Sequence, residues 1–137
     1  MDKCTPESLL AGRNIKLTRQ RQVVLNVIIG YGGPFSASDL HDKIAGEMDL
    51  ATVYRNIEML FNEGIIRQVM NEKDRQYYEL ACEHNPEHPH FYCNSCGKIY
   101  CMKQKKFRQP DIKSAAGGKF VVQETLLQYR GLCPACR

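Results

Sequence analysis

The sequence predicts an α+β chain in which a helical region and a β-hairpin precede a smaller β-rich region. Three observations support this class. Apolar residues recur at helical spacing through the first half of the chain, two β-rich runs then flank a turn, and the remainder holds short β-rich runs with paired cysteines. The two halves of the chain therefore favour different kinds of structure.

Four helices are predicted in the first half from their start and stop signals. A residue with a short polar side chain precedes each helix and can cap its first turn: Thr5, Thr18, Ser36 and Asp49. Pro6 strengthens the first start, and Asp39 forms a near-capping box with Ser36. Gly12, the run Gly30–Pro34, Gly46 and Gly64 indicate where the four helices end.

The fourth helix has the clearest apolar face, made by Val53, Ile57, Leu60 and Phe61. After it, I-I-R-Q-V-M and R-Q-Y-Y-E-L are β-rich runs joined by a turn at Asn71–Asp74. This order of elements is that of a winged helix-turn-helix, in which the helix after the turn enters the major groove of DNA. A small helical bundle with an appended hairpin is the alternative.

The second region begins after a polar segment with two prolines, which we interpret as a hinge at residues 82–89. The hinge separates a winged-helix domain at residues 1–81 from a domain at residues 90–137. Four short β-rich runs are predicted strands in this domain: H-F-Y-C, K-I-Y-C, K-F-V-V-Q and T-L-L-Q-Y. Pro110 restricts any helix that follows it to about Asp111–Ala116. A domain this small is expected to need a metal, a partner chain or both.

Composition excludes several classes of protein. The chain has 137 residues, of which 43% are hydrophobic and 25% are charged, as in a globular protein. It has no apolar run of the roughly 18–20 residues that cross a membrane and no visible secretion signal, so we expect a cytoplasmic protein. The net charge of +4 is mild, so any DNA binding must depend on a local surface.

Two C-x-x-C units give the sharpest chemical signal. A C-x-x-C turn lets two thiolates converge on one ion, and two such turns complete a closed tetrahedral zinc site. An iron–sulfur centre or a redox disulfide are the alternatives. The sequence therefore predicts structural Zn²⁺ at Cys93, Cys96, Cys133 and Cys136.

A second metal site is predicted around the hinge. His88 and His90 point to the same side of an extended segment, so the two imidazoles can share an ion. Further donors close in sequence are Glu79 and Cys82, with His84 in reserve. A polar linker rich in histidine by chance is the alternative, and Cys4 is interpreted as an exposed N-terminal thiol.

A DNA-contacting face is predicted on the fourth helix, opposite its apolar stripe. The side chains there suit phosphates and base edges, and they are Thr52, Tyr54, Arg55 and Asn56. A basic cluster precedes them at Arg13, Lys16, Arg19 and Arg21. The motifs of common hydrolases, zinc proteases and phosphate loops are missing, so we do not expect an enzyme, although a small zinc metalloenzyme is the competing hypothesis.

Several motifs occur along the chain: T-R-Q-R-x-x-V-L from residue 18, S-A-x-D-L from 36, D-L-A-T-V-Y-R-N-I from 49, Y-E-L from 78, H-x-H-F-Y-C-x-x-C-G-K from 88 and G-L-C-x-x-C from 131. Together they resemble the ferric uptake regulator family of bacterial metal-responsive repressors. The resemblance covers nearly the whole chain in the right order. It implies a homodimer whose C-terminal α/β domain dimerises, and which binds AT-rich inverted repeats of double-stranded DNA when a regulatory metal is present.

The resemblance also implies roles for individual residues. Tyr54 is the expected base-contacting aromatic, and Arg55 is a DNA contact beside it. The four paired cysteines match the structural zinc ligands, and Glu79, His88 and His90 match the hinge metal site.

Departures from the family bear on the choice of regulatory metal. Pro34 stands where iron- and peroxide-sensing relatives usually have histidine, and Cys101 stands where they often have an acidic residue. Cys82 resembles the cysteine of the zinc-sensing branch, and Cys101 adds a sulfur donor to the same predicted regulatory site. We therefore expect a zinc-responsive repressor of metal-homeostasis genes, with Fe²⁺ as the other regulatory metal and a peroxide- or redox-responsive regulator as the alternative.

Overall fold

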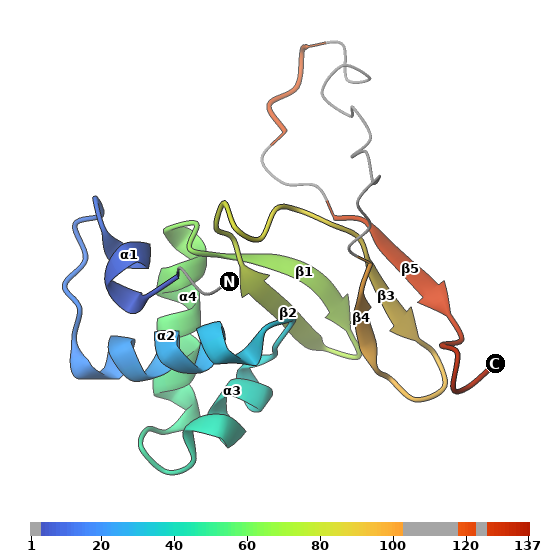
Figure 1. Ribbon diagram of the computed structural model, residues 1–137, viewed down its shortest axis with the longest axis horizontal. Helices are drawn as coiled ribbons and strands as arrows, with labels where there is room; N and C mark the ends of the chain where they lie inside the picture. The colour runs from blue at the N-terminus through green and yellow to red at the C-terminus, as the bar shows by residue number, and fades with distance from the viewer. Residues whose placement is uncertain (1–3, 103–117, 123–125) are drawn as a thin grey trace. The chain divides into compact units, whose positions relative to one another are not determined.

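The computed structural model describes residues 4–102, 118–122 and 126–137 (Figure 1). The chain divides into two compact units, Met1–Glu87 and His88–Arg137. The boundary between the two units, after Glu87, lies inside the hinge that the sequence predicts at residues 82–89. No helix within the described ranges is long and apolar enough to cross a membrane.

The first unit contains four helices and a two-stranded hairpin. The helices are α1 (Pro6–Leu10), α2 (Arg19–Tyr31), α3 (Ala37–Ile44) and α4 (Leu50–Asn62), and the strands are β1 (Ile66–Glu72) and β2 (Arg75–Leu80). All four predicted N-caps are confirmed, because each side-chain oxygen accepts a hydrogen bond from the third residue after it. Ser36 and Asp39 form the complete capping box.

One apolar core holds this unit together. Helices α2, α3 and α4 pack on one another and on the hairpin (Figure 1). The least exposed side chains of this core include Val24, Leu25, Phe35, Leu40, Val53 and Leu60. Burial of this surface is the main stabilising contribution to the unit.

Phe35 fixes the hairpin to the helices. Its N–H donates to the carbonyl of Tyr78 at 2.9 Å, and its carbonyl accepts from the N–H of Tyr78 at 2.8 Å. Phe35 directly precedes the cap of α3, so this bridge sets where the hairpin lies against the helix-turn-helix. The predicted winged helix-turn-helix is confirmed.

The hairpin turn is tighter than predicted. Asn71 and Glu72 still pair with Gln76 and Arg75, and only Lys73 and Asp74 lie between the strands. Both have positive φ, 50° and 64°, as a two-residue turn that matches strand twist requires.

The second unit contains a three-stranded sheet in the order β4-β3-β5. Its strands are β3 (His90–Cys93), β4 (Ile99–Cys101) and β5 (Gln128–Gly131). Strand β4 pairs antiparallel to β3, and β5 pairs parallel to it. The parallel pairing places Cys93 opposite Gly131, so the end of each strand leads into one C-x-x-C turn.

Two of the predicted strands differ from the structure. Residues 119–122 of K-F-V-V-Q do not form a strand, and β5 begins at Gln128, after Leu126 and Leu127 of the last run. The possible helix at Asp111–Ala116 lies outside the described residues.

Leu40→Ala should lower the free energy of unfolding of the first unit by about 2–5 kcal/mol, because Leu40 is fully buried and its truncation leaves a cavity. Chemical denaturation followed by far-ultraviolet circular dichroism measures this unit, since the four described helices all belong to it. Lys43→Ala, an exposed position on the same helix, is the matched control and should leave the midpoint almost unchanged. Equal midpoints for Leu40→Ala and the wild-type protein would contradict this account of the core.

Candidate metal centres and nucleic-acid interface

The two C-x-x-C turns bring four sulfur atoms together in the second unit. Every pair among the Sγ atoms of Cys93, Cys96, Cys133 and Cys136 is within 4.8 Å. The Sγ atoms of Cys96 and Cys133 are 3.8 Å apart, which is about the separation of two thiolates on one tetrahedral zinc ion. None of the seven cysteines is disulfide-bonded.

Backbone hydrogen bonds shape the first turn. The N–H of Gly97 donates to the carbonyl of Cys93 at 2.9 Å, and Gly97 has a φ of +74°, which glycine adopts without strain. In the second turn the N–H groups of Cys136 and Arg137 both donate to the carbonyl of Cys133. Both turns are therefore held by backbone contacts that need no metal.

Hydrogen bonds also favour the ionised form of two of these thiols. The N–H groups of Cys96 and Cys133 donate to Cys93 Sγ at 3.5 and 3.4 Å and lower the pKa of Cys93 to about 6. A hydrogen bond from the Tyr100 hydroxyl lowers the pKa of Cys133 and raises the pKa of Tyr100 to about 12. Hydrogen bonding to Cys133 raises the pKa of Cys136 to about 12. Since the thiolate is the form that binds metal, Cys93 and Cys133 are prepared as ligands.

A second donor set lies in the same unit. His90 is directly paired with Cys101 across β3 and β4, and the rings of His88 and His90 are 4.5 Å apart. The ligand atoms of these three residues are within 4.8 Å of one another. His90 is buried, whereas His88 and Cys101 are half-buried. Imidazole and thiolate are donors that zinc accepts.

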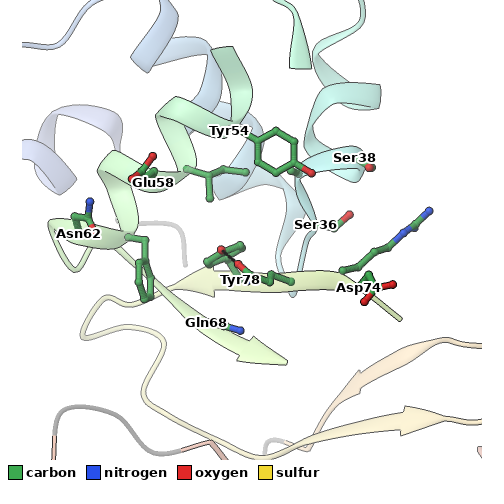
Figure 2. Close-up of a pocket in the computed structure, with 13 residues that line it drawn as sticks. Ser36, Ser38, Tyr54, Glu58, Asn62, Gln68, Asp74 and Tyr78 are labelled. Atoms are coloured by element: carbon green, nitrogen blue, oxygen red, sulfur yellow. Dashed lines mark hydrogen bonds between the residues drawn. The ribbon is translucent and has the colours of Figure 1, made fainter. Parts of the chain in front are cut away.

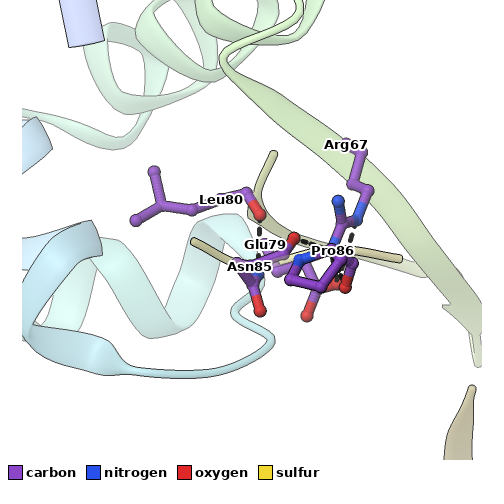
Figure 3. A network of polar contacts seen from close by, with 5 residues as sticks. All are labelled: Arg67, Glu79, Leu80, Asn85 and Pro86. Atoms are coloured by element: carbon purple, nitrogen blue, oxygen red, sulfur yellow. Dashed lines mark hydrogen bonds and ion pairs between the residues drawn. The ribbon is translucent and has the colours of Figure 1, made fainter. Parts of the chain in front are cut away.

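Glu79, predicted as a hinge ligand, belongs to the first unit, where it is 2% exposed and ion-paired. Arg67 lies opposite it in the hairpin, and its Nη2 and Nε donate to Glu79 Oε1 at 2.6 and 3.0 Å (Figure 3). Arg67 Nη2 also donates to the carbonyls of Asn85 and Pro86 at 2.8 and 3.2 Å. The carboxylate charge is thus balanced within the hairpin.

The interpretation of Cys4 as an exposed thiol is wrong. Cys4 is 8% exposed and lies against Cys82 and His84, all within the first unit. Burial, followed by the hydrogen bond to Cys82, raises the pKa of the Cys4 thiol. The sequence gives no local signal for this contact, because Cys4 and Cys82 are far apart in the chain.

The N-terminal half of α4 carries the predicted DNA-contacting residues. Tyr54 is 55% exposed, Arg55 is exposed, and Arg55 Nη2 donates to Thr52 Oγ1 at 3.2 Å. A hollow of about 340 Å³ borders this half, lined by Thr18, Gln20, Arg21, Thr52, Arg55, Asn56 and Met59. The N-termini of α2 and α4 contribute to it, and helix N-termini favour anions such as phosphate.

One predicted DNA contact is placed differently from expectation. Asn56 does not lie on the exposed face: it is 9% exposed, and its Nδ2 donates to the Thr52 carbonyl at 2.9 Å. Arg13 donates to the carbonyls of Leu9 and Glu63, so it contacts the C-terminal end of α4. Lys16 and Arg19 are exposed, and the carbonyl of Lys16 accepts from Arg21.

A larger hollow of about 620 Å³ separates α4 from the hairpin. Figure 2 shows Tyr54 and Tyr78 on opposite sides of it. Its lining contains the charged residues Glu58, Asp74 and Arg75 but neither cysteine nor histidine. None of the metal-donor sets described above opens into it.

Comparison with known proteins identifies the family. The model of the ferric uptake regulator family matches residues 12–130. A zinc uptake regulation protein of Escherichia coli is 30% identical, and the match covers 99% of this chain and 85% of that protein. A ferric uptake regulation protein of Synechococcus elongatus is 27% identical over 91% of this chain and 88% of that protein.

Solved structures agree with this. The ferric uptake regulator of Vibrio cholerae has a TM-score of 0.71 and 26% identity, covering 93% of this chain and 98% of that one. A zinc uptake regulator in complex with zinc and DNA has a TM-score of 0.65 and 29% identity, covering 94% of this chain and 88% of that one. The chain therefore belongs to the ferric uptake regulator family of metal-responsive transcriptional regulators.

Proposed function

We propose that the chain is a zinc-responsive repressor that binds AT-rich inverted repeats of double-stranded DNA as a homodimer in the cytoplasm. One combination of features carries the proposal. Tyr54 and Arg55 are exposed on α4 of a winged helix, and the same chain contains groups of thiol and imidazole side chains that can bind metal. The relative solved with zinc and DNA supports it.

The four-cysteine set is the proposed structural zinc site. An all-sulfur tetrahedral set suits zinc, and the pKa shifts of Cys93 and Cys133 favour the required thiolates. A structural zinc site supplies free energy that folds small domains. The second unit needs such a contribution, because its described residues bury few apolar side chains.

Dimerisation is assigned to the second unit. Among its described residues, the large exposed apolar side chains are Phe120, Val121, Leu126, Tyr129 and Leu132. Tyr129 lies on β5, an edge strand of the sheet, and Leu132 directly follows this strand. An exposed apolar surface beside an open strand edge is suited to pairing with a second copy.

The proposed regulatory ligands are His88, His90 and Cys101, together with Glu79, which the sequence predicts as a ligand of this site. Glu79 belongs to the first unit and the other three belong to the second. Ligands taken from both units would restrict the hinge and set the separation of two recognition helices in a dimer. Successive major-groove faces are about 34 Å apart, so only one spacing engages both half-sites. Metal and DNA then increase each other's affinity.

The identity of the regulatory metal rests on donor chemistry. Cys101 supplies sulfur, and zinc accepts mixed sulfur and nitrogen ligands more readily than iron(II) or manganese(II) does. An iron-responsive regulator is the second candidate, because the curated relatives include ferric uptake regulation proteins. Cys82, also predicted for this site, lies instead against Cys4 and His84.

Cys93→Ser or Cys136→Ser should remove one zinc per chain and dissociate the dimer, because the remaining ligands no longer close the site that folds the dimerisation unit. Metal analysis combined with analytical ultracentrifugation measures both effects. Asn94→Ala, an exposed position between the paired cysteines, is the control and should keep both properties. An intact dimer without zinc would refute the structural role.

Tyr54→Ala and Arg55→Ala should each weaken DNA binding by about tenfold or more, since both side chains project from the exposed face of α4. The probe is DNA selected from a random pool by the wild-type protein, and fluorescence anisotropy measures affinity. Metal content and dimerisation should stay unchanged. Asn62→Ala, an exposed position at the C-terminal end of α4, should bind normally. Normal binding by both Tyr54→Ala and Arg55→Ala would show that another face reads DNA.

Zinc should activate DNA binding at a free concentration about tenfold or more below the concentration of free iron(II) or manganese(II) that is needed. His88→Ala and Cys101→Ser should each shift zinc activation to higher free zinc while leaving the four-cysteine zinc bound. Metal-buffered anisotropy titrations measure the shifts. If oxidant releases DNA at fixed zinc and Cys101→Ser abolishes that response, the redox alternative replaces zinc sensing.

A further inference from the structure

The first unit contains a third group of metal-donor side chains, separate from both sets of the second unit. Cys4 Sγ lies 3.2 Å from Cys82 Sγ and 3.6 Å from His84 Nδ1. The ligand atoms of all three residues are within 4.8 Å of one another. Cys4 is buried, Cys82 is half-buried and the side chain of His84 is 37% exposed, so an ion can enter from the His84 side.

Both parts of this group are anchored by contacts that do not involve the thiols. Cys4 directly precedes Thr5, the N-cap of α1, which forms a complete capping box with Ser8. Cys82 begins a turn closed by a hydrogen bond from the Asn85 N–H to its carbonyl at 2.9 Å. The side chain of Asn85 donates to the Leu80 carbonyl at 2.7 Å and ties this turn to the end of β2. The folded backbone therefore brings the three donors together.

The distances suit a tetrahedral thiolate–imidazole site. With Zn–S of about 2.3 Å and Zn–N of about 2.0–2.1 Å, ligand atoms on one ion lie about 3.6 Å apart for sulfur and nitrogen and about 3.8 Å apart for two sulfurs. The Cys4–His84 distance already matches, and the two sulfurs need to separate by about half an ångström. Glu83 Oε1 lies 3.8 Å from His84 Nε2, beyond hydrogen-bond distance, so the site is argued from the three donors alone.

We propose that Cys4, Cys82 and His84 bind a thiophilic divalent cation of the zinc type, with the fourth position left to solvent. This site is distinct from the four-cysteine set and from the set of His88, His90 and Cys101. It ties the chain before α1 to the first residues of the hinge. An N-terminal thiol thereby becomes part of the metal chemistry of the winged-helix unit.

A disulfide between Cys4 and Cys82 is the competing use of these thiols. The observed sulfur separation of 3.2 Å is well above the roughly 2.05 Å of a disulfide bond. Forming that bond takes two electrons and two protons from the thiols and needs an oxidant. It also gives no role to His84, whose contact with Cys4 the metal site explains.

Cobalt(II) titration of the Cys101→Ser protein tests the site, with zinc retained in the four-cysteine set. Cobalt(II) binds such sites more weakly than zinc does, so the structural zinc stays in place. With Cys101 removed, sulfur-to-cobalt charge-transfer absorption must come from Cys4 and Cys82. We expect this absorption in Cys101→Ser, its loss on adding Cys4→Ser, and a loss of affinity of about tenfold or more on adding His84→Ala.

Two further measurements keep the test decisive. Cys4→His should restore cobalt binding with weaker charge-transfer absorption, which separates loss of a ligand from loss of α1 packing. In the wild-type protein, added zinc should slow alkylation of Cys4 and Cys82. Unchanged absorption in the Cys4→Ser variant would assign Cys82 to another site and overturn the proposal. Absence of cobalt binding, with formation of a Cys4–Cys82 disulfide under mild oxidant, would also overturn it.

Discussion

The second unit depends on one geometric constraint: the four thiols of its two C-x-x-C turns must lie together. Among its described residues, the buried hydrophobic side chains are Tyr92, Cys93 and Cys133, so two of the three are themselves metal donors. The interior of this unit is therefore centred on sulfur rather than on aliphatic side chains. The parallel pairing of β3 with β5 has a structural purpose here, since it delivers both C-x-x-C turns to the same end of the sheet.

The first unit has the opposite character. Its core consists of aliphatic and aromatic side chains from its four described helices and from the hairpin. Its polar chemistry includes the exposed half of α4 and a buried ion pair between Glu79 and Arg67 in the hairpin. One chain thus combines a unit stabilised by burial of apolar surface with a unit whose described interior is centred on four converging thiols.

Local signals predicted most of the first unit. The N-caps at Thr18 and Asp49 fixed helix starts, because a side-chain oxygen three residues before an N–H is a short-range interaction visible in sequence. The four-cysteine set was also predictable, since each half is a local turn. Features that depend on tertiary packing were missed: Asn56 is turned inward to the Thr52 carbonyl, and Cys4 is buried against residues near the other end of the unit. No periodicity or spacing reports such long-range contacts.

The ion pair between Arg67 and Glu79 also links the hairpin to the hinge. The same guanidinium nitrogen that contacts Glu79 Oε1 donates to the carbonyls of Asn85 and Pro86. Any cation that draws on the Glu79 carboxylate must compete with a positive charge already held there. The charge around this one buried carboxylate therefore bears on the peptide groups of Asn85 and Pro86, close to the end of the first unit.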